Sequence, residues 1–205
     1  MECRTGNRTG NRSDRKKEET KKRIIYIAMD LFMKQGFDKT TVDKIAEEAD
    51  IAKGTIYNHF PVKEAIICEY VQRIIGDQGP EVLNLLHQLP DTRSRLSNVF
   101  YKTLNWMNIN LNTDIYEKYF AYRMQVQTIR DKSLRSGLNN VLEYVLELGK
   151  ETGEIRKDVP SKILAHNLEI INSVTAIAWV SSPESFSIYE AIDLNIDLFV
   201  NGVKA

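Results

Sequence analysis

Apolar side chains recur with a helical period along most of the chain. In residues 15–35, the positions 24, 27, 28, 31 and 32 are all apolar and follow the i, i+3, i+4, i+7, i+8 spacing of one buried stripe. Helical patterns also fill 40–49, 56–60, 62–75, 80–89, 92–110, 113–126, 130–151, 161–181 and 185–201. No stretch sustains the period of two that marks a strand. We therefore predict an all-α protein of about nine helices.

The first of these helices has a clear end, and the next has a clear start. Gly36 supplies a C-terminal stop, and Phe37 is placed to fold back as its hydrophobic contact. Thr40 is a good N-cap for the second helix, with an acid three residues later, as in a capping box. Residues 50–52 leave room only for a turn before the third helix. Two short helices joined in this way predict a helix-turn-helix.

The segment 50–60 carries polar groups on one side only. On a helical wheel Ile56 and Phe60 face inward, and Gly54 and Asn58 fall opposite them. Thr55 and Tyr57 flank that outer pair, and Lys53 stands at the start of the helix. A recognition helix in the major groove needs bulk toward the protein and donors and acceptors outward. The alternative is an ordinary surface helix, because any amphipathic helix has a polar outside.

Charge is balanced over the chain but not along it. Residues 1–63 hold 14 basic and 10 acidic side chains, and residues 64–205 hold 14 basic and 18 acidic ones. This asymmetry predicts that the N-terminal part meets an anion. Residues 1–14 are polar and repeat "TGNR" twice, which indicates a disordered basic arm. That arm is either a solvated leader or a contact to DNA phosphates.

The pattern from Gly36 to Glu64 resembles the DNA-binding domain of the TetR (tetracycline repressor) family of bacterial transcription regulators. The matching residues read G-F-x-x-T-T-V-x-x-I-A-x-x-A-x-I-x-K-G-T-I-Y-x-H-F-x-x-K-E. The resemblance implies that Thr41 and Lys63 contact phosphate. It also implies a DNA-facing set of Lys53, Gly54, Thr55, Tyr57, Asn58 and His59. The sequence departs from the family at Ala52, where a serine is common, and at Val62, whose side chain cannot cap a helix.

Neither an enzyme nor a metal site is indicated. The three histidines, His59, His87 and His166, lack metal-ligand spacing, and neither a G-x-S-x-G motif nor a phosphate loop is present. Cys3 and Cys68 form no disulfide framework. No signal peptide and no apolar run of membrane-spanning length occurs in the sequence. We expect a cytoplasmic protein without enzymatic activity, cofactor or metal.

The middle helices are rich in aromatic residues and methionines, which serve either as core or as pocket walls. The resemblance implies a ligand cavity among these helices, and the clustering of aromatic residues and methionines predicts a small, largely apolar effector. Our candidates for its wall are Trp106, Tyr119, Phe120, Arg123 and Met124. Arg123 is a charge that can meet an anionic effector, or it can pair with Glu117 or Asp131.

The last two helices are apolar on more than one face, whereas a lone surface helix needs only one stripe. Either they are central core helices or they are buried by both the monomer core and a second copy, as the resemblance implies. Our candidates for the dimer face are Ile163, Ile170, Val174, Ile177, Ile188, Ile192 and Phe199. The other stripes are Leu164, Leu168, Ile171 and Ala178, and Ala191, Leu194 and Leu198.

These observations predict three parts: a disordered arm (1–14), a three-helix DNA-binding domain (15–68) and an effector-binding and dimerisation domain (69–205). We expect a ligand-responsive transcription regulator, a repressor, that binds a palindromic double-stranded DNA operator as a homodimer. The alternative is a protein-interaction module that kept the helix-turn-helix without specific DNA readout.

Overall fold

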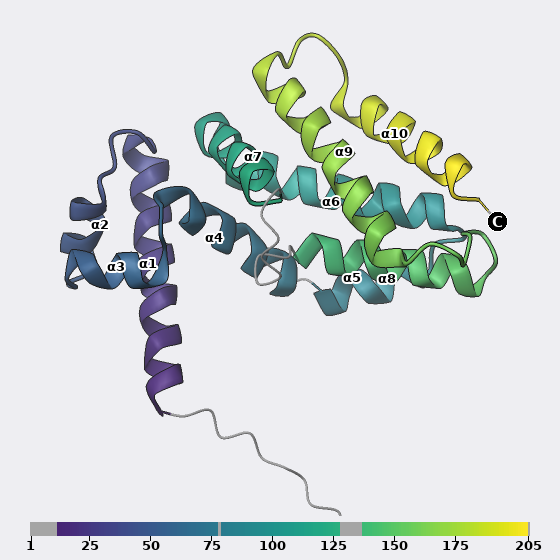
Figure 1. Ribbon diagram of the computed structural model, residues 1–205. Coiled ribbons are helices and arrows are strands. Elements are labelled where there is room, and N and C mark those ends of the chain that lie inside the picture. The colour runs from purple at the N-terminus through teal and green to yellow at the C-terminus, as the bar shows by residue number, and fades with distance from the viewer. Residues whose placement is uncertain (1–11, 78, 128–136, 205) are drawn as a thin grey trace, which may run out of the picture. The chain divides into compact units, whose positions relative to one another are not determined.

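The computed structural model describes residues 12–77, 79–127 and 137–204, and its regular secondary structure over these ranges is helical, apart from one isolated bridge between Ile155 and Lys204. The described residues form ten helices, one for each of the ten helical ranges in the sequence, where the predicted total was about nine (Figure 1). They are α1 Arg12–Gln35, α2 Val42–Glu48, α3 Lys53–His59, α4 Lys63–Asp77, α5 Gly79–Leu86, α6 Thr92–Asn110, α7 Thr113–Gln127, α8 Gly137–Glu151, α9 Ser161–Ser181 and α10 Ile188–Gly202.

The chain divides into two compact units, one ending at Ile66 and the other beginning at Ile67. The first contains α1, α2, α3 and the start of α4. The second contains the rest of α4 and α5 to α10. Most of the predicted arm, residues 1–11, lies outside the described residues, whereas Arg12, Ser13 and Asp14 belong to α1. Residues 130–136, predicted as the start of a helix, also lie outside the described ranges.

The buried stripe of α1 differs from the predicted one. Ile24, Ala28 and Phe32 are fully buried as expected. Ile25 and Met29 join them, while Ile27 and Leu31 are only half-buried. The predicted and the observed stripe share Ile24, Ala28 and Phe32, and their centres lie about 60° apart around the helix. Which one is buried depends on where α2 and α3 pack, and the period of the pattern does not contain that information.

The turn between α1 and α2 is held by its own side chains. Gly36 has a φ of +89°, a left-handed conformation that favours glycine at the end of a helix. The rings of Phe32 and Phe37 lie 4.9 Å apart, which confirms the predicted fold-back. Thr41, not Thr40, caps α2, since its hydroxyl accepts a hydrogen bond from the Lys44 amide at 3.1 Å. The Thr40 hydroxyl is buried and instead donates to the Gly36 carbonyl at 2.8 Å.

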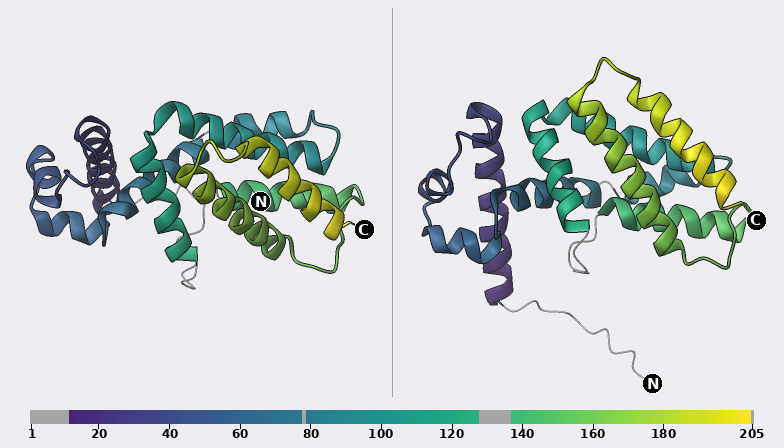
Figure 2. Two further views of the ribbon diagram at one scale, coloured as in Figure 1. Left: turned by 90° about the horizontal axis from the view of Figure 1, so that it is seen from above. Right: turned by 45° about the horizontal axis from the view of Figure 1, so that its top comes forward.

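The second unit is a bundle in which α9 packs against α7, α8 and α10, and α6 packs against α8 and α10 (Figure 2). Its apolar core includes Leu96, Ile115, Leu142, Leu168 and Ile196. α10 begins at Ile188, three residues later than predicted, because the Ser187 hydroxyl caps it by accepting from the Glu190 amide.

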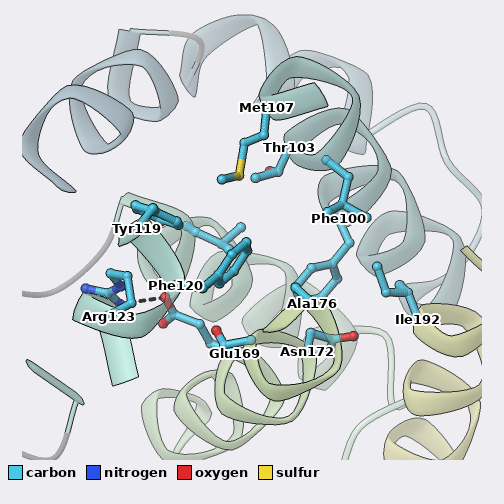
Figure 3. A pocket seen from close by; sticks show the side chains of 13 residues that line it. Phe100, Thr103, Met107, Tyr119, Phe120, Arg123, Glu169, Asn172, Ala176 and Ile192 are labelled. Carbon is cyan, nitrogen blue, oxygen red and sulfur yellow. Dashed lines mark hydrogen bonds and ion pairs between the residues drawn. The ribbon is translucent and has the colours of Figure 1, made fainter. Parts of the chain in front are cut away.

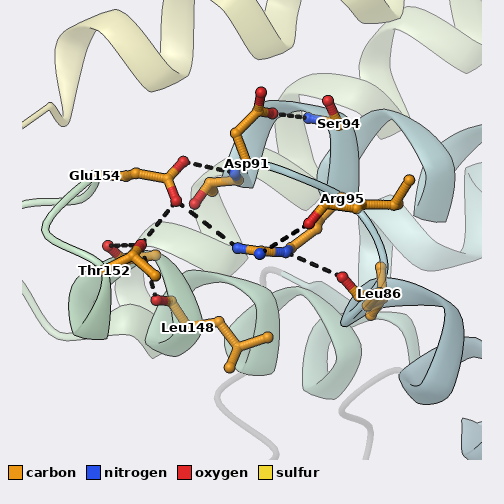
Figure 4. A network of polar contacts seen from close by, with 10 residues as sticks. Leu86, Asp91, Ser94, Arg95, Leu148, Thr152 and Glu154 are labelled. Carbon is orange, nitrogen blue, oxygen red and sulfur yellow. Dashed lines mark hydrogen bonds and ion pairs between the residues drawn. The ribbon is translucent and has the colours of Figure 1, made fainter.

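A polar network joins two connections of this unit, the one between α5 and α6 and the one between α8 and α9 (Figure 4). The buried Arg95 donates to the carbonyls of Leu86 at 3.1 Å and Leu89 at 2.9 Å, so it satisfies carbonyls that the end of α5 leaves open. Glu154, in the loop after α8, accepts from the Thr92 amide at 2.7 Å. Burial alone would raise the pKa of Glu154, but the bonds from Thr92 and Thr152 lower it, so this carboxylate stays charged.

Candidate DNA-binding site and effector cavity

The helix-turn-helix presents α3 with one face to solvent. Ile56 is 1% exposed and Phe60 is 3% exposed, so both anchor the helix as the wheel predicts. Asp50 adopts a φ of +48° in the turn before α3, a conformation that aspartate tolerates better than most residues. Of the residues named as DNA-facing, Thr41, Lys53, Gly54, Tyr57 and Asn58 are exposed, and Thr55, His59 and Lys63 are half-buried.

Lys53 at the start of α3 is engaged by α2. Its ammonium lies 2.8 Å from the Asp43 carboxylate. The hydrogen bond that the ammonium donates to this carboxylate raises the pKa of Lys53, so the side chain remains a cation. The pair is exposed and therefore exchanges readily with solvent or with another anion. Asp43 thus holds Lys53 beside the outer face of α3.

The surface around Gly54 is open. A Cβ atom built at this position meets no other heavy atom within 4 Å, and the backbone φ lies in the range that any residue adopts. The fold itself therefore does not require glycine here, although glycine is unfavourable within a helix. The open space at Gly54 leaves room for a partner to approach the backbone closely.

We predict that Gly54→Ala leaves the protein folded and stabilises it by up to about 1 kcal/mol, because alanine favours the helix. We expect the same substitution to weaken DNA binding at least tenfold, because the added methyl group holds the backbone away from its partner. Thermal unfolding and DNA-binding isotherms on one preparation test both halves. Unchanged DNA affinity would contradict the close approach.

Two predicted phosphate contacts already have partners within the fold. The Thr41 hydroxyl accepts the capping bond of α2, which leaves its own hydrogen to donate. The Lys63 ammonium donates to the carbonyls of Phe37 at 3.0 Å and Thr40 at 2.7 Å, and it lies 4.2 Å from the centre of the Phe37 ring. An ammonium carries three donors, and these bonds use two of them. Lys63 thus ties the start of α4 to the α1–α2 turn.

His59 ends α3 next to Phe60, with the two ring centres 6.3 Å apart. Burial lowers its pKa, and the neighbouring cations Lys17 and Lys21 lower it further. The imidazole is therefore neutral at pH 7 and offers one donor and one acceptor.

A small cavity lies in the second unit between α6, α7, α9 and α10 (Figure 3). Its free space is about 30 Å³, which is room for about one water molecule, so a larger ligand requires the walls to move apart. Tyr119, Phe120 and Arg123, three of the five wall candidates, line it from α7. The remaining lining residues are Phe100, Thr103, Leu104, Met107, Leu138, Glu169, Asn172, Ser173, Ala176 and Ile192.

A buried ion pair forms one side of this cavity. The Arg123 guanidinium donates to a Glu169 carboxylate oxygen at 2.7 Å, and the Asn139 amide donates to the other oxygen at 3.0 Å. Burial opposes the charge on Arg123, but Glu169 outweighs it and raises the pKa of Arg123. The partner is therefore Glu169 from α9 and not Glu117, while Asp131 lies outside the described residues. The charge of Arg123 is neutralised inside the protein.

The other two wall candidates lie elsewhere. Trp106 lines a second cavity and packs against Tyr70, with ring centres 6.0 Å apart. Met124 is half-buried and lines neither cavity. The sequence does contain one signal for the ion pair, which is the single acid, Glu169, within the otherwise uncharged run from Ile163 to Ser182. A lone charge in an apolar helix requires a buried partner.

α9 and α10 expose apolar side chains on their outer faces. Ile163 is 51% exposed, Ile171 43% and Val174 49% on α9, and Leu194 is 59% and Leu198 66% exposed on α10. The inner faces of both helices are buried, and Asn195 of α10 donates to Thr175 of α9 at 2.8 Å. A patch of this kind on a folded unit marks an interaction surface.

The predicted dimer residues divide between the two faces. Ile163 and Val174 are exposed, and Ile170, Ile177 and Phe199 are half-buried. Ile188 and Ile192 are buried in the protomer core at 3% and 1% exposure, which corrects their assignment to the dimer face. On α10 the other stripe, with Leu194 and Leu198, faces outward.

Ser161–Ser181 also meets the length and hydropathy of a membrane span, but its buried inner face is typical of a core helix.

Comparison with known proteins agrees with this architecture. Residues 24–70 match the family described as bacterial regulatory proteins, tetR family. The fatty acid metabolism regulator protein of Bacillus subtilis is 22% identical over 182 residues, which are 88% of this chain and 93% of that protein. Two solved structures share the fold. The Thermus thermophilus TetR family repressor FadR with lauroyl-CoA has a TM-score of 0.77, 24% identity and coverage of 90% and 95% of the two chains. The Bacillus subtilis FadR with stearoyl-CoA has a TM-score of 0.59, 20% identity and coverage of 89% and 98%.

A helix-turn-helix unit followed by a helical bundle is the architecture of a DNA-binding transcription regulator. Residues 24–70 match the tetR family of bacterial regulatory proteins, and the curated relatives and solved structures support a TetR family regulator. Its relatives are consistent with the ligand-responsive repressor that the sequence predicts.

Proposed function

We propose that the protein represses transcription as a homodimer, with α3 of each protomer in the major groove of a palindromic operator. The observation that carries this proposal is the outer face of α3, which is open at Gly54 and bordered by Lys53, Tyr57 and Asn58. Two recognition helices in successive major grooves require a spacing of ~34–36 Å or a multiple of it. Selection of bound fragments from a random DNA pool tests the proposal, and a palindromic consensus is the expected result.

We assign different roles to the residues around α3. Lys63 and Thr41, at helix starts, contact phosphates, and Thr55, Tyr57 and Asn58 face base edges. Phosphate contacts position the protein, and base contacts specify the sequence. The exposed Lys53 and the neutral His59 border the same surface.

We expect Lys63→Ala to weaken binding to the operator and to scrambled duplex alike and to lower the salt slope by about one unit. We expect Asn58→Ala to reduce the free energy of binding to the operator by ~1–3 kcal/mol and to relax the sequence preference at one or two base pairs. We expect its affinity for scrambled duplex to change little. Binding isotherms at several salt concentrations measure both. Because Lys63 also holds two carbonyls, thermal unfolding must show that its variant is folded. A change of base preference in the Lys63 variant would reverse the assignment.

We propose that the effector occupies the cavity of the second unit and releases the repressor from DNA. The Arg123–Glu169 pair is satisfied internally, so an anion placed beside it would compete with Glu169 for Arg123 and be repelled by Glu169. The part of the effector inside this cavity is therefore uncharged and largely apolar. Acyl thioesters meet this requirement, and two structural relatives bind lauroyl-CoA and stearoyl-CoA. The effector shifts the equilibrium only by its different affinities for the two states.

The remaining features of the proposal follow from the same observations. The exposed faces of α9 and α10 pair with those of a second copy. The protein acts in the cytoplasm, where its operator lies, and it has no enzymatic role. The alternative, an interaction module without DNA readout, predicts no sequence preference in the selection experiment and no salt-dependent binding to random duplex.

A further inference from the structure

An ion pair links the two helices of the helix-turn-helix on its exposed side. Asp43 lies in the first turn of α2, and Lys53 is the first residue of α3. The Lys53 ammonium donates to the Asp43 carboxylate at 2.8 Å. The two side chains are 48% exposed for Lys53 and 69% for Asp43. The pair therefore lies on the surface that the proposed function places against DNA.

Asp43 differs from the other acids of α2 in the partner that it binds. Glu47 and Glu48 both pair with Lys44 of the same helix, at 3.1 Å and 3.0 Å. Asp43 does not cap α2 either, since a threonine hydroxyl accepts that bond. Its carboxylate instead reaches Lys53 on the neighbouring helix. The contact of Asp43 thus restrains a residue of α3 rather than the start of its own helix.

This restraint acts on a side chain that has two kinds of target on DNA. A lysine is a compact charge on a flexible stem, so an unrestrained one reaches phosphates over a wide area. The bond to Asp43 fixes the ammonium beside the outer face of α3, where Tyr57 is exposed one turn further along. The first residues of a recognition helix are those that contact base edges. A restrained Lys53 is therefore placed at the bases, whereas a released one is attracted to phosphates.

We propose that Lys53 donates to the N7 and O6 atoms of a guanine in each half of the operator and that Asp43 positions it there. Guanine offers these two acceptors in the major groove, and arginine or lysine is their commonest partner. The Asp43 carboxylate also repels phosphates, so it opposes binding to duplexes that lack the guanine. Asp43 is thus a positioning residue that increases the ratio of operator affinity to non-specific affinity. This assignment rests on the proposed DNA-binding function and adds a base and a specificity determinant to it.

The role of Asp43 is tested with Asp43→Asn, which keeps the shape of the side chain and removes its charge. We expect the affinity for scrambled duplex to rise about threefold for each protomer, ~10-fold for a dimer, which is the size of effect that an exposed ion pair exerts. The salt dependence on scrambled duplex should steepen by about one unit for each protomer, because Lys53 then joins a phosphate. We expect operator affinity to change less than about threefold, so the specificity ratio falls. Binding isotherms at several salt concentrations measure these changes.

Two controls separate positioning from a general effect of charge. Glu48→Gln removes the same charge from the same helix, but from a pair with Lys44. We expect it to leave the salt dependence unchanged. Asp43→Asn added to Lys53→Met should also leave it unchanged, because the cation that it would release is gone. Equal effects of Asp43→Asn and Glu48→Gln, or a steeper salt dependence without Lys53, would overturn the positioning role. Circular dichroism checks that each variant is folded, as we expect for substitutions in exposed pairs.

The guanine is identified with operator duplexes in which 7-deazaguanine replaces one guanine at a time, which removes the N7 acceptor. We expect the wild type and the control Lys44→Met to lose about tenfold in affinity at one guanine of each half of the operator. Lys53→Met should bind the natural operator more weakly and lose less than about twofold at that guanine, since its contact is already absent.

Two further outcomes are distinct. If no guanine distinguishes the wild type from Lys53→Met, then Lys53 contacts phosphate, and the assignment is wrong while the operator function stands. If the wild type selects no consensus from the random pool and binds all duplexes alike, the proposed function is wrong and this assignment with it.

Discussion

Replacing Val174 by aspartate will convert the protein to a monomer and reduce its affinity for the operator by roughly 10²–10⁴. Val174 is 49% exposed on the outer face of α9 and lies near the other apolar side chains of that face. In a two-fold symmetric interface each substitution is present twice, so two carboxylates would lose water together. An unpaired charge without solvent is far more costly than the apolar contact that it replaces. Loss of the second protomer removes one of the two half-site contacts.

Light scattering measures the first effect, with an expected wild-type mass of about twice the 23.6 kDa of the chain. Leu194→Asp on α10 should act in the same way. Ile109→Asp is the control, because Ile109 has the highest exposure, 82%, of the large apolar side chains in the described part of the chain, and it lies on α6 rather than on α9 or α10. A Val174 variant that stays dimeric and binds the operator normally would show that the interface lies elsewhere.

Replacing Glu169 by alanine will destabilise the protein by ~3–5 kcal/mol, because it leaves the Arg123 guanidinium charged and buried without its carboxylate. The side chains of this pair are only 4% and 5% exposed. The Asn139 amide also loses an acceptor. The double variant, Arg123→Met with Glu169→Leu, should recover most of the lost free energy of unfolding, since a hydrophobic pair of similar volume leaves no unpaired charge.

Urea unfolding measures the difference in the free energy of unfolding between the wild type and each variant. The protomer concentration is kept fixed, since the stability of a dimer depends on it. Asp30→Ala is the matched control. Asp30 and Lys34 form a pair of similar length, 2.8 Å against 2.7 Å, but their side chains are 57% and 71% exposed. We expect Asp30→Ala to lower the free energy of unfolding by less than about 0.5 kcal/mol. Equal effects of the two substitutions would mean that Arg123 finds another partner when Glu169 is removed.

The two predictions address different faces of α9. Val174 points outward, and its substitution affects assembly. Glu169 points inward, and its substitution affects the free energy of unfolding and the cavity wall. The helix is thus a shared wall between the proposed interface and the proposed effector site.

The sequence by itself determined the all-α class, the ranges of most helices and the inward and outward sides of α3. These features depend on neighbours in the chain, because a helical period, a capping hydroxyl and a stop glycine all act within one or two turns. Gly36, Ile56 and Phe60 were therefore placed correctly. The motif from Gly36 to Glu64 indicated the resemblance to the TetR family, because many specific residue types match that family at the same spacing.

Only the tertiary structure decided which residues meet. The partner of Arg123 is 46 residues away on another helix, so no local spacing indicates it. The choice between overlapping stripes in α1 and between the two apolar stripes of α10 depended on where other helices pack. The sequence pattern predicted Thr40 as the cap of α2, but Thr40 is buried and the neighbouring Thr41 is the cap. In each case the local pattern permits two solutions of similar free energy, and contacts between distant segments select one of them.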